Sequence, residues 1–200
     1  MAPRPPTDTE ALRGSLLEHA RAVIARDGVD GLTMRSLAGQ AGTAVGMSYK
    51  AFASRDELLR ELTRSSLHEL AAQIEEWAAR PGGALADRLM EFADLQSASD
   101  APALVAHLGH DSRGGQILQK AVDDGATRSW ATVMTEFLRA GQQRGTVRGD
   151  VDVEAFGFFI TAALHYVLVT DRPFLAPDRT TLEQYVTGIA AQIEVGPTRS

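Results

Sequence analysis

The chain has 200 residues, 44% of them hydrophobic, and a formal net charge of −6. This length allows one large domain or two small ones, with ample material for a core. The absence of cysteine excludes disulfides, thiolate metal sites and cysteine nucleophiles. No window approaches the roughly 18 uninterrupted apolar residues of a membrane span, and the N-terminus lacks the apolar region of a secretory signal. We therefore expect a cytoplasmic protein without a membrane segment.

The charge is unevenly distributed along the chain. Residues 1–64 carry nine basic and eight acidic side chains, a net charge of +1, whereas residues 65–200 carry 11 and 18, a net charge of −7. The acidity therefore lies outside the N-terminal part. A nucleic-acid surface there would depend on local clustering of basic side chains and not on a broad positive field.

Helical periodicity dominates the whole chain, and no run of alternating apolar and polar residues predicts a strand. Residues 1–8 are rich in proline and predict a flexible arm. The apolar spacing then predicts a helix over residues 9–27, which Asp27 and Gly28 end.

Two short helices are predicted within residues 33–52, TMRSLAGQAGTAVGMSYKAF. Thr33 is the expected N-cap of the first helix, because its hydroxyl can accept from a first-turn N–H. Gly42 ends that helix, since glycine enters the left-handed region without a Cβ penalty. Thr43 is expected to cap the second helix, which runs to about Lys50. The pair has the outline of a DNA-reading helix-turn-helix.

The rest of the chain predicts a larger helical body. Ser54 and Glu57 form an expected capping box at the start of a helix over residues 55–79. Further helices are predicted at about 84–97, 101–109, from the segment 110–115 to about 143 with a bend near Gly125, 152–170 and 178–194. We expect an all-α protein of about nine helices, with a helix-turn-helix domain at 9–54 and an effector-binding and dimerisation domain at 55–200.

The N-terminal pattern resembles the TetR family of transcriptional regulators over about 50 residues in consistent spacing. The matching positions are Gly28, Thr33, Leu37, Ala38, Ala41, Gly42, Gly46, Tyr49, Phe52, Ser54, Arg55 and Leu58. The resemblance implies a ligand-responsive transcription regulator, most often a repressor, that binds a palindromic double-stranded DNA operator.

The resemblance and the docking geometry of the motif together predict a set of DNA-binding residues. The set is Thr33, Arg35, Thr43, Ala44, Val45, Ser48, Tyr49, Lys50 and Arg55. Thr33, Tyr49, Lys50 and Arg55 are the candidates for the phosphate backbone.

The chain departs from the family where Ala44, Val45 and Ala51 stand at positions that are often polar or aromatic. Val45 can contact a thymine methyl group but cannot hydrogen-bond a base edge. Base specificity is therefore expected to depend on Thr43, Ser48, Lys50 and Arg35, with some readout of DNA shape.

The helix at 152–170 is apolar on nearly all sides, so every side of it needs a cover. With the helix at 178–194 it would form, by resemblance, a four-helix bundle between the two subunits of a homodimer. A central position in the core of a monomer is the alternative.

A mixed set of aromatic, aliphatic and polar residues in the body is typical of the lining of an apolar ligand cavity, although ordinary core packing would explain each residue singly. The set is Leu89, Phe92, Leu104, His107, Trp130, Met134, Phe137, Phe159 and His165. We expect a small apolar or aromatic effector, to which His107 or His165 donates one hydrogen bond.

Two other functions remain open from the residues. The helix-turn-helix could serve protein contact in a helical adaptor. A metal-dependent enzyme could use His107, His110, Asp111 or Glu136, but a third metal ligand and a nucleophile–base set are not identifiable. We therefore expect no catalytic residue, no metal and no cofactor.

Overall fold

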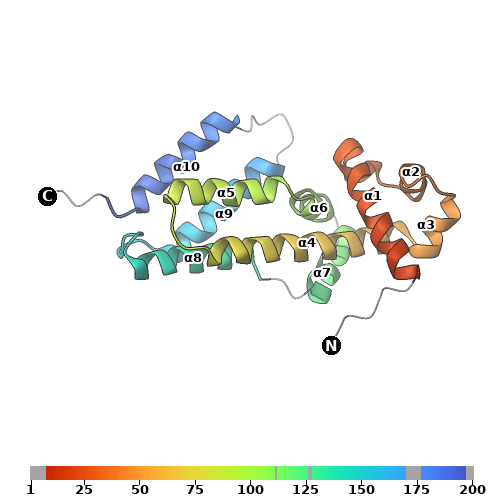
Figure 1. The fold of residues 1–200 in the computed structure, drawn as a ribbon, viewed down its shortest axis with the longest axis horizontal. Helices are drawn as coiled ribbons and strands as arrows, with labels where there is room; N and C mark the ends of the chain where they lie inside the picture. Colours follow the sequence, from red (N-terminus) through yellow and green to blue (C-terminus); the bar gives the residue numbers. More distant parts are fainter. Residues whose placement is uncertain (1–7, 111, 126–127, 170–176, 197–200) are drawn as a thin grey trace. The chain divides into compact units, whose positions relative to one another are not determined.

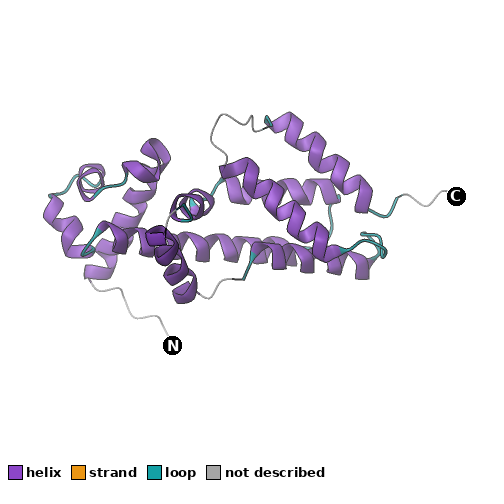
Figure 2. Ribbon diagram, turned by 180° about the vertical axis from the view of Figure 1, so that it is seen from behind, coloured by secondary structure: helices purple, strands orange, loops and turns teal. Residues whose placement is uncertain are grey.

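The structure is a computed structural model that describes residues 8–110, 112–125, 128–169 and 177–196. Within these ranges the chain forms ten α-helices and one isolated β-bridge, between Val147 and Glu194 (Figures 1 and 2). The all-α prediction is confirmed. None of the described helices is long and apolar enough to cross a membrane. The arm expected at residues 1–8 lies outside the described residues except for Asp8, where the first helix begins.

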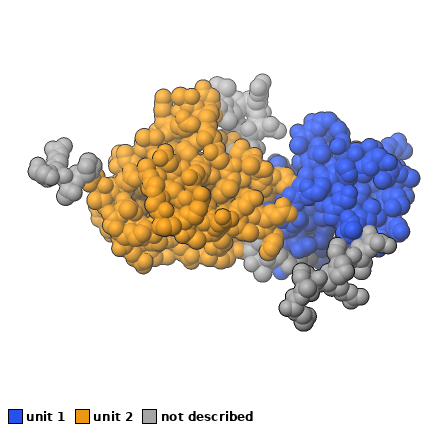
Figure 3. All heavy atoms as spheres, viewed as in Figure 1, with its two compact units in different colours: residues 1–67, 103–126 blue, residues 68–102, 127–200 orange. Residues whose placement is uncertain are grey.

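The chain divides into two compact units (Figure 3). Unit 1 comprises Met1–Leu67 and Ala103–Ala126, and unit 2 comprises His68–Pro102 and Thr127–Ser200. The units do not follow the domain boundary expected after residue 54, because the body segment at 103–126 belongs to the same unit as the helix-turn-helix.

Unit 1 is built around one hydrophobic core. Its helices are α1 (Asp8–Gly31), α2 (Met34–Gln40), α3 (Val45–Ala51), the first half of α4 (Arg55–Ala79), most of α6 (Ala101–Leu108) and α7 (Ser112–Gly125). Leu16, Leu37, Phe52 and Leu58 are buried in the same cluster as Leu104 of α6. Residues more than 40 positions apart therefore share this core.

A break in α1 at Gly28 directs the chain toward α2. Gly28 has φ 72°, in the left-handed region that glycine adopts without a Cβ penalty. Val29 and Leu32, which follow the break, are buried in the core of unit 1. The predicted end of the first helix at Asp27 and Gly28 is thereby confirmed as a break in the helical backbone.

Unit 2 consists of the second half of α4 together with α5 (Leu85–Ser97), α8 (Trp130–Arg144), α9 (Val153–Val169) and α10 (Arg179–Ile193). Helix α8 lies beside α9, and α5 lies beside α10 (Figure 1). The α8–α9 contact is close at Gly157, where an added Cβ would lie 2.9 Å from the backbone N and Cα atoms of Thr135.

The single long helix expected up to residue 143 is wrong, because two helices, α7 and α8, occupy this stretch. Helix α7 ends at Gly125, and Ser129 before α8 has an extended backbone with φ −60° and ψ 134°. Arg128 stands between the helices and forms ion pairs with Glu75 of α4 and Glu136 of α8. Apolar spacing continues on both sides of the break, so periodicity alone did not reveal it.

Candidate nucleic-acid interface

The turn between α2 and α3 sets the geometry of the motif. Gly42 has φ 64°, and its N–H donates to the carbonyl of Gly39 at 3.2 Å. The N–H of Thr43 donates to the carbonyl of Ala38 at 2.9 Å. This pair of bonds is a Schellman motif, which satisfies the last carbonyls of α2. The predicted role of Gly42 is confirmed.

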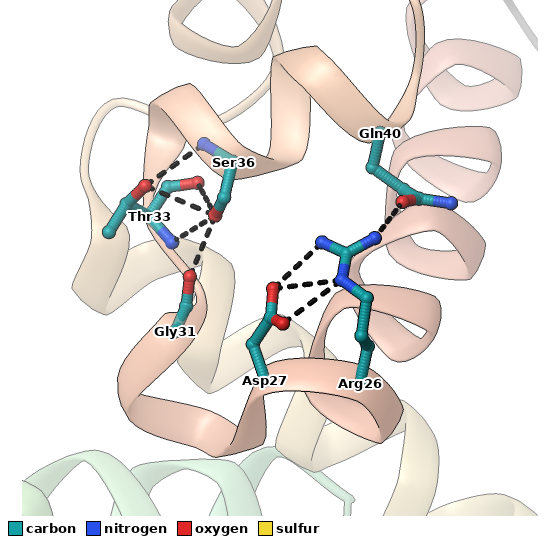
Figure 4. Close-up of polar contacts among 6 residues, drawn as sticks. All are labelled: Arg26, Asp27, Gly31, Thr33, Ser36 and Gln40. Carbon is teal, nitrogen blue, oxygen red and sulfur yellow. Dashed lines mark hydrogen bonds and ion pairs between the residues drawn. The ribbon is translucent and has the colours of Figure 1, made fainter.

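Thr33 caps α2, as its sequence position predicted (Figure 4). Its hydroxyl accepts from the N–H of Ser36 at 3.0 Å, and the Ser36 hydroxyl accepts from the N–H of Thr33 at 2.8 Å. Ser36 also donates to the carbonyl of Gly31 at 2.8 Å. This reciprocal capping box was not predicted, because serine is a less familiar partner than glutamate or glutamine in that motif.

A second polar contact ties α1 to α2. Arg26 donates to the side-chain carbonyl of Gln40 at 2.8 Å and to the carboxylate of Asp27 (Figure 4). The hydrogen bond from Arg26 lowers the pKa of Asp27. These contacts lie on the exposed surface, so they orient α2 more than they stabilise the fold.

The predicted cap of α3 is wrong. Ala44 occupies the N-cap position with an extended backbone, φ −69° and ψ 144°, and makes no side-chain capping bond. Thr43 lies one residue earlier, where its N–H belongs to the turn. Its side chain is exposed and has no role in holding α3 among the described residues.

Most of the predicted DNA-binding residues form an exposed surface. Val45 is 37% exposed and Tyr49 is 55% exposed. The other exposed members of the set are Thr33, Arg35, Thr43, Ala44 and Lys50. Arg35 and Lys50 have no ion pair or hydrogen bond in the part of the chain that the structure describes, in contrast to Arg13, which pairs with Glu57 at 3.1 Å.

Two other members of the predicted DNA-binding set contribute to the packing and hydrogen bonding of unit 1. Ser48 is completely buried, so its hydroxyl cannot reach a base edge and its predicted DNA contact is wrong. Arg55 donates from Nε to the carbonyl of Leu32 at 2.6 Å and from Nη2 to the carbonyl of Val29 at 2.9 Å. Its guanidinium therefore holds the segment between α1 and α2.

Arg13 of α1 fixes the end of α3. It donates to the carbonyl of Ala51 at 2.6 Å, and its guanidinium lies 4.6 Å from the ring centroid of Phe52. At the start of α4 the predicted box is half formed: the Ser54 hydroxyl accepts from the N–H of Glu57 at 3.1 Å, but the Glu57 carboxylate bonds the residue before Ser54 and not Ser54 itself. The Glu57 carboxylate accepts from the N–H of Ala53, and this bond, followed by that from Arg13, lowers the pKa of Glu57.

The predicted effector residues are divided between the two units. Leu104 belongs to the core of unit 1. His107, also in unit 1, lies 3.8 Å from the carboxylate of Asp30. Phe159, in unit 2, is 67% exposed and so lines no interior cavity within its own chain.

Three further residues of the predicted set are buried in the core of unit 2. The Trp77 ring lies 5.1 Å from that of Phe92 and 4.4 Å from that of Phe137, centroid to centroid. Met134 is completely buried. Trp77 was not among the predicted site residues, although a lone tryptophan on the apolar side of a long helix was the available signal.

Trp130 and His165 form a partly polar pair between α8 and α9. Their ring centroids lie 5.8 Å apart. His165 Nδ1 and the hydroxyl of Thr161, one helical turn earlier, are buried without a hydrogen-bond partner among the described residues. Burial lowers the pKa of His165. Thr161 was missed in the sequence, where a threonine four residues before a histidine on an apolar helix was its only signal.

An apolar groove of about 510 Å³ lies between α9 and α10. Leu89 of α5 is the one member of the predicted effector set that lines it, beside Leu164, Val167, Leu182 and Tyr185. In the described part of the chain, no group of three or more histidine or acidic residues could hold a metal ion. Asp111 of the metal alternative lies outside the described residues.

Residues 16–62, which span most of α1 to the first turns of α4, match the family described as bacterial regulatory proteins, tetR family. The chain is also similar to the HTH-type transcriptional repressor KstR2 of Mycobacterium tuberculosis. The two are 28% identical over 151 residues, which cover 74% of this chain and 75% of the relative.

Solved structures show the same fold over nearly the whole chain. The structure of KstR2 has a TM-score of 0.59 and 24% identity, and the match covers 92% of this chain and 95% of that one. Reduced NemR of Escherichia coli has a TM-score of 0.68 and 15% identity, with 94% and 100% covered. Residues 16–62 of the protein therefore match the DNA-binding part of the tetR family of bacterial regulatory proteins, and most of the chain is similar to a transcriptional repressor.

Proposed function

We propose that the protein is a homodimeric repressor that binds a palindromic operator and is released from it by a small-molecule effector. The observation that carries the proposal is the exposed surface of the helix-turn-helix, where the side chains of Arg35 and Lys50 have no partner among the described residues and lie beside the half-exposed Tyr49. Unpaired cations on such a surface are available to phosphate oxygens, which supply most of the affinity for DNA.

The exposed residues have separate roles in this proposal. Four residues contact phosphates and fix the position of the helix-turn-helix on the DNA. They are Lys50 and Tyr49 near the end of α3, and Thr33 and Arg35 at the start of α2. Thr43, Ala44 and Val45, at the start of α3, face the base edges, where Val45 and Ala44 offer only apolar contact. The buried Ser48 leaves Thr43 as the main hydrogen-bonding group for a base.

Lys50→Ala is expected to weaken binding to all DNA sequences alike. Each lost phosphate contact reduces the slope of log K against log salt by about 0.9, so a dimer loses about 2. Thr43→Ala is expected to relax base preference at one position, at a cost of about 1–3 kcal/mol for the preferred base. Gel-shift titrations with the DNA flanking the gene, repeated over a series of salt concentrations, measure both effects.

The matched control is Lys120→Ala, because Lys120 is an exposed lysine of α7 outside the helix-turn-helix. The substitution changes the net charge of the protein by the same amount, and it should leave the slope of log K against log salt unchanged. Equal slopes for the Lys50 and Lys120 variants would refute the role of Lys50. Absence of salt-sensitive binding to any near-palindrome would refute the regulator itself.

The dimer is supported by a continuous apolar surface on α9. Phe158 and Phe159 are 58% and 67% exposed, and Tyr166 is 55% exposed. With the exposed Ala162 and Ala163 they fall within about 140° of the helix circumference. Soluble monomers rarely expose a surface of this kind, and a second copy of α9 and α10 would bury it in a four-helix bundle.

The effector site is proposed between α8 and α9, at Trp130, Thr161 and His165. Two buried polar atoms without partners are costly, since each forgoes its hydrogen bonds with water. An effector with an apolar body and at least one oxygen atom would satisfy them and cover the Trp130 ring. The solved relative KstR2 is described as a ketosteroid regulator, and a steroid ketone has this chemistry.

Thr161→Val is expected to weaken binding of a ketosteroid by about 10-fold, because it removes one hydrogen bond worth about 1.4 kcal/mol while it keeps the shape of the side chain. Androstenedione is a suitable probe, and the shift in melting temperature of the protein measures its binding. The control is Thr132→Val, an exposed threonine of α8. Equal ketosteroid affinity in the two variants would refute the hydrogen bond from Thr161. If no compound in a panel of apolar oxygen-containing molecules shifted the melting temperature, the proposed effector site would be refuted.

Release from DNA would follow from a shift between two conformations. Helix α4 contributes residues to both units, so a change in unit 2 that reorients α4 also changes the orientation of the helix-turn-helix. The two heads of the dimer would then lose the separation of about 34 Å that fits successive major grooves. The effector achieves this only through unequal affinity for the two conformations.

A further inference from the structure

A small cavity of about 40 Å³ lies at one end of unit 2. It is partly open to solvent and is lined by the start of α5, the end of α8 and the segment that follows α10. Gly83, Arg88, Gly141, Arg144 and Glu194 are among its lining residues. Gly83 has φ +87°, and an added Cβ there would lie 3.2 Å from Cδ of Arg88, so the glycine allows the loop to approach the arginine.

Arg88 is a buried cation with a fixed side chain, and only 5% of the residue is exposed. Its Nη1 donates to Glu91 at 2.9 Å and its Nη2 donates to the carbonyl of Trp77. The guanidinium lies 5.0 Å from the Trp77 ring centroid and 5.5 Å from that of Phe137. Its Nε is buried and has no hydrogen-bond partner among the described residues, so one charged donor is left over.

The charges around the cavity do not balance. Arg88 and Arg80 share the same oxygen of Glu91, at 2.9 and 3.0 Å. Arg144 has no ion pair in the described part of the chain, and it is close enough to Arg88 that their repulsion adds to burial in lowering the pKa of Arg88. Glu194, the other carboxylate here, accepts from the N–H of Leu85 at 2.8 Å and so serves the start of α5.

The size of the cavity limits what it can hold. A volume of about 40 Å³ exceeds the roughly 10–15 Å³ that one water molecule needs, and it is far below the roughly 300 Å³ of a drug-sized ligand site. A buried guanidinium N–H binds an anion more strongly than a neutral acceptor, because the hydrogen bond is charge-assisted.

We propose that this cavity is a binding site for one small monovalent anion, of halide or formate size, held by Nε of Arg88 and by Arg144. The anion neutralises the excess positive charge and links the loop before α5, the end of α8 and the segment after α10. This site is separate from the helix-turn-helix and from the pair formed by Trp130 and His165.

Sodium bromide and sodium formate are expected to raise the melting temperature of the full-length protein along a saturating curve, at constant ionic strength set with sodium gluconate. Arg144→Gln should shift half-saturation to at least about 10-fold higher concentration, since it removes one charge-assisted hydrogen bond to the anion. The matched control is Arg139→Gln, an exposed arginine on the same helix, which should keep the curve of the unmodified protein.

Bromide also scatters anomalously, so a crystal grown with sodium bromide should show an anomalous peak beside Nε of Arg88. The Arg144→Gln crystal should lack that peak under the same conditions. Equal bromide curves for the Arg144 and Arg139 variants would overturn the proposal. A peak without a saturable melting shift would overturn it too, because it would show binding at crystal concentration only.

Discussion

Gly157→Ala is expected to lower the melting temperature of the protein by about 10 °C. The added methyl group would overlap the Thr135 hydroxyl and lie 2.9 Å from the Thr135 backbone N and Cα atoms. Backbone cannot move aside as a flexible side chain can, so α8 and α9 would have to separate. Overpacking of this kind costs about 3 kcal/mol, and each kcal/mol corresponds to about 2–4 °C in a protein of this size.

Calorimetry on the single and double variants separates the two parts of this clash. Thr135→Ala in the Gly157→Ala background removes the hydroxyl contact and leaves the backbone contact, so it should restore only part of the lost stability. The control is Gly14→Ala in α1, where an added Cβ meets nothing within 4 Å. That change should stabilise the protein by up to about 1 kcal/mol through helix propensity. A melting temperature unchanged by Gly157→Ala would refute the close approach of the two helices.

Phe159→Asp is expected to split the proposed dimer and to reduce operator affinity by about 100-fold or more. Phe159 is 67% exposed in the single chain, so a charge there should not disturb the fold of one subunit. In a two-fold interface the charge would be buried twice, without a partner, which is strongly unfavourable. A monomer then binds one half-site, and the loss of linked binding accounts for a factor of about 10²–10⁴.

The association state follows from sedimentation, and the affinity from gel shifts on a two-site and a single half-site DNA. The control is Gln73→Asp on α4, which adds the same charge at an exposed position outside the proposed interface. The affinity for a single half-site should be nearly equal for the two variants, since neither substitution changes the helix-turn-helix. A Phe159→Asp protein that remains dimeric would refute the assignment of this surface.

The helix-turn-helix was predictable because local rules determine it. Thr33 caps α2 through bonds that span three residues, and Gly42 and Gly28 take the left-handed backbone that only glycine adopts freely. The cap of α3 was predicted one residue too early, because both Thr43 and Ala44 precede the helix and only the backbone angles decide between them.

Two residues of the predicted DNA-binding set make tertiary contacts that the sequence did not reveal. Ser48 is polar and lies on a short helix, yet the core of unit 1 covers it completely. Arg55 reaches two carbonyls, of Leu32 and Val29, more than 20 residues earlier in the chain. Neither contact has a signature in the local pattern, so an exposed role was the natural expectation for both residues.

The predicted effector residues are divided between the two units for a related reason. Helical spacing identifies an apolar face but not the neighbour that this face contacts. Leu104 and His107 were predicted with the body, and the fold places them in unit 1 with the helix-turn-helix. Trp130 and His165 were predicted on different helices, and their rings are in contact in the structure. Thr161 was identified as a neighbour of this pair only from its buried hydroxyl in the structure.

The placement of Leu104 and Leu108 in the core of unit 1 has a consequence for protein engineering. The compact unit that contains the helix-turn-helix is not a contiguous stretch of sequence. A chimera that exchanges the first 67 residues for those of a relative would pack most of one core against the Leu104 and Leu108 side chains of another. We therefore expect a chimera to keep its stability when the N-terminal segment is exchanged together with residues 103–126.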